Sequence, residues 1–331
     1  MANSRLGMDT KSITEGALMA ALTAVLAMAG IYIPPLAPVV MLIWTLPVVV
    51  ICLRRGMRAG AATMAVAGFV ILVIATPTLA IEMLLRSAGP ALIIGYGLQR
   101  QWKSEHTILF TGIAAFIGLT ASFALSFIIM GVDFDGFFSV DPNAIDEIVK
   151  MFSDYGFMDQ FQMSAPEMAD YISAMFVMLK HLFPAILLIA GLSTAFTNFI
   201  AANIVLKKLK IPLPPVTKLS TFRLPFGFVF AFILGMGLAV VGGSVLPGIP
   251  AAARFGQNIM LVCVACYFFQ GLGLIFHFIG KAEPSTRKFW KFSLVLVIFV
   301  TFLYFFSIVG FIGVADALFD FRKQGFFAVK K

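Results

Sequence analysis

Charged residues are scarce in this chain: they make up 12% of its 331 residues, whereas hydrophobic residues make up 60%. A soluble domain of this length would need far more charge on its surface. Cysteine is also scarce, because only Cys52, Cys263 and Cys266 occur, each in or beside an apolar segment. No disulfide framework is therefore expected. These absences exclude a soluble globular protein and a disulfide-rich secreted one, and they predict a polytopic membrane protein surrounded by lipid.

Signatures of nucleotide binding and catalysis are missing as well. The chain has no G-x-x-x-x-G-K-[ST] phosphate loop, so it cannot hydrolyse ATP by that route. It also has no H-E-x-x-H or G-x-S-x-G signature, which would indicate a metalloprotease or a serine hydrolase. We therefore expect no enzyme, no cofactor and no metal site, and any pumping would need a partner ATPase or an ion gradient.

The net charge of +8 does not indicate nucleic-acid binding, because the basic residues form short clusters between apolar runs. Such clusters are typical of cytoplasmic loops that fix the orientation of a membrane protein. They lie on alternate loops, at Arg54, Arg55 and Arg58, at Arg100 and Lys103, at Lys207, Lys208, Lys210, Lys218 and Arg223, and at Lys281, Arg287, Lys288 and Lys291. With Arg5 and Lys11 they place the N-terminus in the cytoplasm.

The apolar runs predict an all-α bundle of eight or nine membrane spans. The candidate spans are residues 13–33, 37–53, 59–76, 78–98, 107–131, 168–206, 224–246, 256–280 and 289–313. Nine spans would put the C-terminus outside, whereas the basic tail with Arg322, Lys323, Lys330 and Lys331 favours the inside. Either one span is miscounted, in which case the long 168–206 run with Pro184 is the first candidate, or the tail does not follow the rule that basic segments face the cytoplasm.

The segment 132–167 differs from the rest, because it carries eight carboxylates and a single base, Lys150. It lies on the outer side in the predicted topology. The sequence Asp141-Pro142-Asn143 is a typical helix start, and a short amphipathic helix is expected over 145–155. The segment is either a lid over the bundle or a solvated loop. It separates a five-span bundle at 1–131 from a C-terminal bundle of about four spans at 168–313, which a tail at 314–331 follows.

The most informative stretch is 78–99, TLAIEMLLRSAGPALIIGYGLQ, which is apolar enough to cross a bilayer yet carries Glu82 and Arg86. Residues four apart share one face of a helix, so these two can pair, and Arg86 would lie about 12 Å from Thr78. An ionisable group at membrane depth normally faces a protein interior or a wet cavity. We expect the pair either to bind ligand in a polar cavity or to form an interfacial ion pair with Arg86 extending outward.

Other polar residues inside the spans are few, and they include Asn198 on the sixth span with Asn258 and Gln270 on the eighth. Asn and Gln in hydrocarbon usually form hydrogen bonds across helices, so contacts between helices are their simplest role. Gln270 precedes a G-L-G sequence, where a backbone could approach a ligand or another helix. Asn198 and Gln270 are therefore weaker ligand-binding candidates than Glu82 and Arg86.

The first span carries a stripe of small residues that includes Ala17, Ala21 and Ala24. Small residues let helix backbones approach closely, which is how membrane helices pack. The stripe either packs inside the protein or forms a docking face for a partner membrane protein.

Longer motifs in the chain resemble those of the YybS-like family of bacterial membrane proteins. They are SITEGALMAALTAVLAMAGIYIP, RRGMRAGAA, GYGLQRQWKS, YFFQGLGLIFHFIGK and the ending GFIGVADALFDFR. The first five or six spans are also similar to the S-components of energy-coupling-factor vitamin transporters, whose alanine stripe contacts a transmembrane coupling subunit; the helices after residue 206 depart from that pattern. The resemblance implies a bacterial cytoplasmic membrane and, through Ala17, Ala21 and Ala24, a coupling subunit with ATPases as partner.

Two hypotheses about function follow. The first is a binding or transport protein for a vitamin-like or metabolite ligand, without its own ATPase, in which the ligand enters from the outer side past segment 132–167. The alternative is a membrane scaffold or assembly factor that acts through protein contacts of the alanine stripe, the acidic segment and the basic tail.

Overall fold

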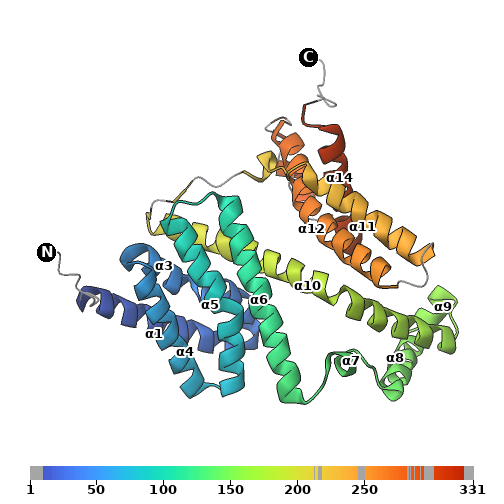
Figure 1. Ribbon diagram of the computed structural model, residues 1–331, viewed down its shortest axis with the longest axis horizontal. Helices are drawn as coiled ribbons and strands as arrows, with labels where there is room; N and C mark the ends of the chain where they lie inside the picture. Colours follow the sequence, from blue (N-terminus) through green and yellow to red (C-terminus); the bar gives the residue numbers. More distant parts are fainter. Residues whose placement is uncertain are drawn as a thin grey trace. The chain divides into compact units, whose positions relative to one another are not determined.

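The protein is described by a computed structural model, which covers residues 10–211, 213–214, 218–244, 250–281, 283, 285–286, 288–290, 292–293 and 302–323. These residues form helices and no strand, which confirms the predicted all-α class (Figure 1). Seven of the described helices are long and apolar enough to cross a membrane. Two shorter apolar helices, Gly227–Gly242 and Phe306–Phe319, bring the described candidates to the predicted number of about nine.

The chain divides into two compact units. Unit 1 comprises Met1–Gly136 and Leu187–Val216, and unit 2 comprises Phe137–Ile186 and Thr217–Lys331. The division differs from the predicted organisation, because the long helix α10 (Ala165–Lys208) contributes its first half to unit 2 and its second half to unit 1. Each unit is therefore built from segments that are distant in the sequence.

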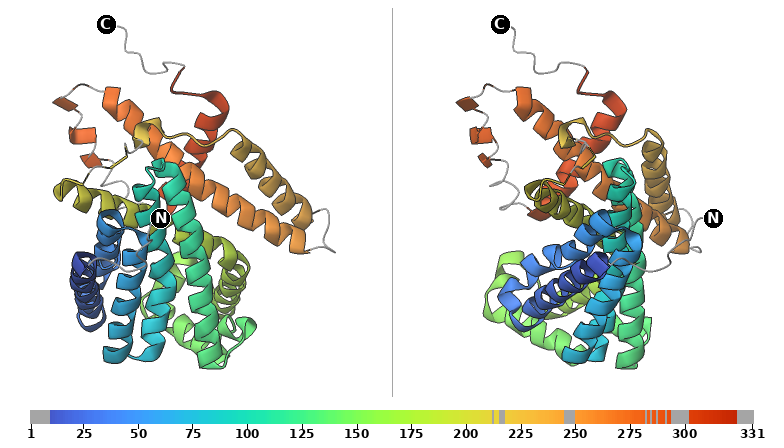
Figure 2. Two further views of the ribbon diagram at one scale, coloured as in Figure 1. Left: turned by 60° about the vertical axis from the view of Figure 1, so that its left-hand side comes forward. Right: turned by 90° about the vertical axis from the view of Figure 1, so that its left-hand side faces the viewer.

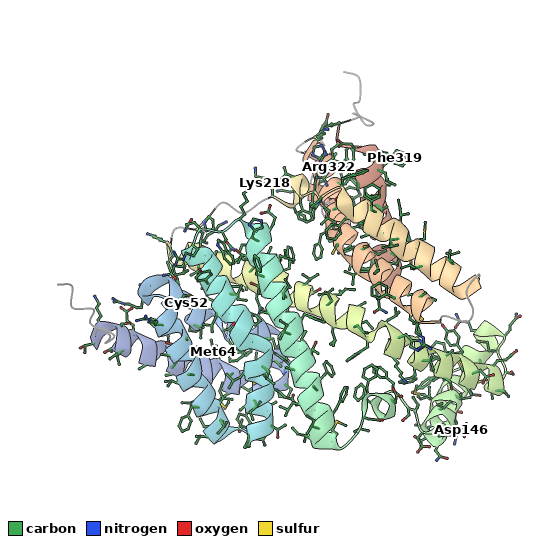
Figure 3. The ribbon with its side chains drawn as sticks, viewed as in Figure 1. Cys52, Met64, Asp146, Lys218, Phe319 and Arg322 are labelled. Atoms are coloured by element: carbon green, nitrogen blue, oxygen red, sulfur yellow. The ribbon has the colours of Figure 1, made fainter. Side chains whose placement is uncertain are left out.

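Unit 1 is a bundle of apolar helices. Its elements before α10 are α1 (Thr10–Tyr32), η1 (Pro34–Leu36), α2 (Ala37–Ile43), α3 (Leu46–Arg55), α4 (Met57–Ile74), α5 (Pro77–Gln99) and α6 (Ser104–Met130). Figure 1 shows α4, α5 and α6 side by side. The core lies between α1, α3, α4, α5 and the second half of α10, and Cys52 and Met64, labelled in Figure 3, are buried in it. The outward faces are apolar, as in a protein whose solvent is lipid.

The acidic segment belongs largely to unit 2 and is folded. It forms α7 (Phe134–Phe137), α8 (Pro142–Asp154) and α9 (Phe157–Phe161) before α10 begins. The predicted helix start is confirmed, because the Asp141 side chain accepts a hydrogen bond from the Asn143 N–H at 3.0 Å. Val149 of α8 packs with Met168 and Ile172 of α10, while Asp146, labelled in Figure 3, is on the exposed face. Hydrophobic contacts therefore attach α8 to α10, which a purely solvated loop would lack.

The rest of unit 2 is a three-helix group of α11 (Gly227–Ser244), α12 (Pro250–Lys281) and α14 (Phe302–Phe319). Figure 2 shows α11 and α12 adjacent in both of its views. These two are antiparallel, since Gly235 lies against Met260 whereas Gly242 lies against Ala253. Gly242 and Gly256 permit the close approach, because a Cβ on either would overlap the facing backbone.

Helices α12 and α14 run in the same direction. Gly310 lies against Val264, and Gly313 lies against Tyr267 three residues further along both helices. α14 also extends the predicted span 289–313 to Phe319, so the predicted tail begins too early. Helix α14 consequently ends on the side of unit 2 where α12 ends and α11 begins.

Helix α10 contains Pro184, which has no N–H to bond the carbonyl one turn earlier. The side-chain amide of Asn258 on α12 bridges the next N–H and carbonyl along the helix, which the proline ring also keeps apart. It accepts a hydrogen bond from the Ala185 N–H at 3.0 Å and donates one to the His181 carbonyl at 2.8 Å. A proline in a membrane helix is tolerated when a neighbouring helix supplies such partners. The predicted role of Asn258 in bonding across helices is thereby confirmed.

Candidate functional site

The first candidate site is the ion pair predicted on α5. Glu82 and Arg86 lie one turn apart, and the Arg86 Nη2 atom is 3.2 Å from the Glu82 Oε2 atom. With Pro77 as the first residue of the helix, the Arg86 backbone lies about 13 Å from that end. Because Glu82 is nearer to the Pro77 end, the Arg86 side chain points toward that end. The structure thus joins the two predicted residues.

Two serines of α6 complete this polar cluster, which we call the α5–α6 cluster: Glu82, Arg86, Ser122 and Ser126. The Arg86 Nε atom donates to the Ser122 hydroxyl at 2.8 Å, and the Ser126 hydroxyl donates to the Glu82 Oε1 atom at 2.9 Å. Sequence reasoning did not identify the serines. A signal was available, because they repeat the four-residue spacing of Glu82 and Arg86 in the next, antiparallel span.

The close approach of α5 and α6 is permitted by a glycine. A Cβ on Gly118 would overlap the Leu85 carbonyl and lie 3.2 Å from the Arg86 Cα atom. Small residues at such a crossing bring polar side chains of two membrane helices within hydrogen-bond range. The pair is nevertheless accessible, since the Arg86 side chain is 40% exposed and that of Glu82 is 19% exposed. The cluster can therefore contact a molecule outside the two helices.

The other two predicted ligand-binding residues do not join the α5–α6 cluster. Asn198 is buried in the second half of α10, and in the described part of the chain it makes no hydrogen bond to Glu82 or Arg86. Gln270 belongs to unit 2, where it is buried and bonded to other partners. The described contacts therefore do not join the four predicted ligand-binding residues into a single site.

Gln270 is part of a second cluster, the α12–α14 cluster of Gln270, Asp316 and Arg322. Arg322 Nε lies 3.1 Å from Asp316 Oδ2, and the Gln270 Nε2 atom donates to the same oxygen at 3.1 Å. Both charged side chains are almost fully buried, at 4% for Arg322 and 1% for Asp316. Figure 3 shows Arg322 just beyond the end of α14.

The α12–α14 cluster also holds the loop before α11. The Leu224 N–H donates to Gln270 Oε1 at 2.9 Å, and Arg322 Nη1 donates to the Ser220 carbonyl at 2.8 Å. The cluster therefore joins three parts of unit 2: α12, the end of α14 and the loop before α11. One atom, Asp316 Oδ1, is buried without a hydrogen-bond partner among the described residues.

A surface ion pair follows this cluster. Arg223 lies 2.7 Å from Asp320, and Lys323 lies 2.9 Å from it. These hydrogen-bonded cations lower the pKa of Asp320 to about 2. The predicted basic tail is thus partly neutralised at Lys323, whereas Lys330 and Lys331 lie outside the described residues.

The alanine stripe of α1 is divided between two environments. Ala24 is buried in the core of unit 1, whereas Ala17 and Ala21 are exposed. Ala24 therefore packs inside the protein, because a core position cannot contact a partner, and docking through Ala17 and Ala21 stays a prediction. Within the described ranges, no group of three or more His, Cys, Asp or Glu side chains could hold a metal ion.

Comparison with known proteins places the chain in a family. The uncharacterized protein YybS of Bacillus subtilis (strain 168) is 20% identical over 322 residues, which cover 96% of this chain and 99% of the relative. This confirms the YybS-like resemblance, while similarity to S-components stays a prediction. No solved structure matches the chain. A family model described as a predicted membrane protein matches residues 21–317, and because that range is most of the sequence, the chain belongs to the DUF2232 family of membrane proteins.

Proposed function

We propose that this membrane protein binds a small amphipathic molecule at the α5–α6 cluster and takes part in its transport without an ATPase or a catalytic step of its own. The observation that carries the proposal is the accessible guanidinium of Arg86. A guanidinium has five N–H donors, and the hydrogen bonds to Glu82 and Ser122 engage two of them. The other donors can receive an acceptor group of a ligand.

The surroundings of the cluster define the ligand class. Ile81 beside Glu82 is exposed, as is Ile129, one turn from Ser126 on the same face of α6. A ligand at this position would place an acceptor group, such as a carboxylate, on Arg86 and an apolar part against these side chains. An ionisable group in a membrane span is a candidate for such a functional role. We place the protein in a bacterial cytoplasmic membrane, with a coupling subunit and its ATPases as the source of energy.

The test is ligand retention. Protein extracted gently from its own membrane is incubated with a metabolite extract, and the small molecules that it retains are identified by native mass spectrometry. We expect Arg86→Ala and Glu82→Ala to lose the retained compound, and cells carrying them to lose its uptake. Thr120→Ala is the matched control, because Thr120 is an exposed hydroxyl of α6 that bonds only its own helix.

Arg86→Lys separates a charge requirement from a geometric one, since lysine keeps the charge but not the planar fork of donors. Retention of no compound by the wild-type protein, together with normal uptake in cells that carry either alanine variant, would contradict the proposal.

The alternative function is a scaffold that binds a partner membrane protein through α1. Its specific support is the exposed pair Ala17 and Ala21, four residues apart on one helix face, where a partner helix could approach closely. Crosslinking from position 21 that captures one stable partner without ATPase subunits, combined with retention of no small molecule, would favour the scaffold over the transporter.

A further inference from the structure

A cavity of about 650 Å³ lies at the end of unit 1 where the α3–α4 turn meets the end of α5. Its lining includes Arg55, Gly56, Arg58, Tyr96, Gln99 and Arg100. The volume is in the range of small-molecule sites. The two loops that contribute the arginines are separated in the sequence by two spans, and both carry a predicted basic cluster. The fold therefore gathers basic residues from both loops around one hollow.

Among the described residues, one of the three arginines that line this cavity, Arg55, has a carboxylate partner. Glu15 holds Arg55 in a two-point contact, with Nε–Oε2 at 2.8 Å and Nη2–Oε1 at 2.7 Å. Neither Arg58 nor Arg100 forms an ion pair with a carboxylate among the described residues. Within the described residues, the Arg58 and Arg100 guanidinium groups are therefore open to an anion from outside the chain.

The cavity is also ordered by local contacts. Arg100 lies over the ring of Tyr96, with its Cζ atom 5.5 Å from the ring centroid. Gly56 has a φ of 90°, a conformation that glycine adopts readily, and it directly precedes the first turn of α4. That turn contains no acidic residue and has no side-chain cap, so its N–H groups add to the positive potential on this side of the cavity.

We propose that this cavity binds a phosphate-bearing anion. Arginine pairs with phosphate through two parallel hydrogen bonds, and an uncapped helix N-terminus adds backbone donors to such a site. Tyr96 and Trp102 pack edge to face at 5.2 Å, and such rings mark the level of lipid headgroups. The anion is therefore either the phosphate of an acidic lipid or that of a soluble compound. The proposal is independent of the ligand at the α5–α6 cluster.

The experiment measures binding to the full-length protein in neutral detergent. The probes are cardiolipin, phosphatidylcholine as the neutral lipid, and inorganic pyrophosphate, each titrated while the thermal midpoint and the native mass spectrum are recorded. The variant is Arg58→Gln with Arg100→Gln, both at exposed positions. The matched control is Arg54→Gln, which removes an exposed charge next to Arg55 but not from the lining.

We expect the double variant to weaken binding of the phosphate probe about tenfold or more, with Arg54→Gln changing it less than about threefold. Binding of cardiolipin without pyrophosphate identifies a lipid headgroup, whereas binding of pyrophosphate identifies a soluble phosphate compound. An equal loss in Arg54→Gln and in the double variant would overturn the proposal, because it would show diffuse attraction and no site. The absence of binding by both phosphate probes would also overturn it.

Discussion

The two units contain ion pairs of the same chemistry in opposite surroundings. In unit 1 the Glu82–Arg86 pair lies between helices but is accessible, whereas in unit 2 the Asp316–Arg322 pair is almost completely buried. The difference follows from their partners. Two serine hydroxyls supplement the first pair, while a side-chain amide and two backbone carbonyls surround the second.

This contrast separates a site that can act on other molecules from one that holds the fold. Burying a charge is costly unless it is paired and hydrogen-bonded, so the α12–α14 cluster must be nearly complete to exist. An accessible pair meets no such demand, and its spare donors can be used by a ligand. The predictions below test this division, beginning with the largest expected effect on stability.

Removal of one partner from the buried pair should have the largest effect. Asp316→Ala or Arg322→Ala leaves an unpaired buried charge, and we expect a loss of about 3–5 kcal/mol in the free energy of unfolding of unit 2. Unfolding in mixed micelles of dodecyl sulfate, followed by tyrosine or tryptophan fluorescence, measures it. Lys323→Ala is the control, because Lys323 is 80% exposed.

Replacing both partners sharpens the test. Asp316→Leu with Arg322→Met removes both charges, and it should recover part of the lost stability, because an apolar pair carries no desolvation cost. A double variant that is less stable than either single variant would contradict this explanation. The loss in the single variants would then not come from the unpaired charge, and the proposed contrast between the two clusters would not hold for the α12–α14 cluster.

The hydrogen bonds of Asn258 at Pro184 should have an intermediate effect. Asn258→Ala leaves a buried N–H and a carbonyl of α10 without these partners, and we expect a loss of about 1–3 kcal/mol. Gln257→Ala, at the exposed neighbouring position, should change little. In the background of Pro184→Ala the loss should shrink, because without the proline ring the Ala185 N–H can bond the His181 carbonyl within the helix. An unchanged loss in that background would show that the contribution of Asn258 to stability does not depend on Pro184.

The accessible pair should contribute least to stability. We expect Glu82→Ala and Arg86→Ala each to change the free energy of unfolding by about 1 kcal/mol or less, measured in the same micelles. The same variants should abolish ligand retention. They would thus lose function and keep stability, whereas variants of the buried pair lose stability. A large loss of stability in either variant would make the α5–α6 cluster structural and weaken the transport proposal.

The two clusters also differ in what the sequence could reveal. Glu82 and Arg86 were predictable, because a four-residue spacing within one helix determines their contact. Asp316 and Arg322 are six residues apart, and they meet only because the helix ends at Phe319 and Asp320 adopts a φ of 47°. The contact of Asp316 with Gln270 further requires α12 and α14 to be parallel. No periodicity encodes that arrangement, so Arg322 was predicted to belong to a basic tail.

The smallest effect on stability is expected from a reporter protein fused to the C-terminus. If α12 and α14 are parallel, the C-terminus lies on the same side as the loop containing Arg223. That loop is predicted to be cytoplasmic. A C-terminal green fluorescent protein should then fluoresce, and a C-terminal alkaline phosphatase should be inactive in bacterial cells. Reporters inserted in the acidic segment between α7 and α8 should give the reverse result. Active phosphatase at the C-terminus would contradict the parallel packing, and with it the contact of Asp316 with Gln270 that distinguishes the buried pair.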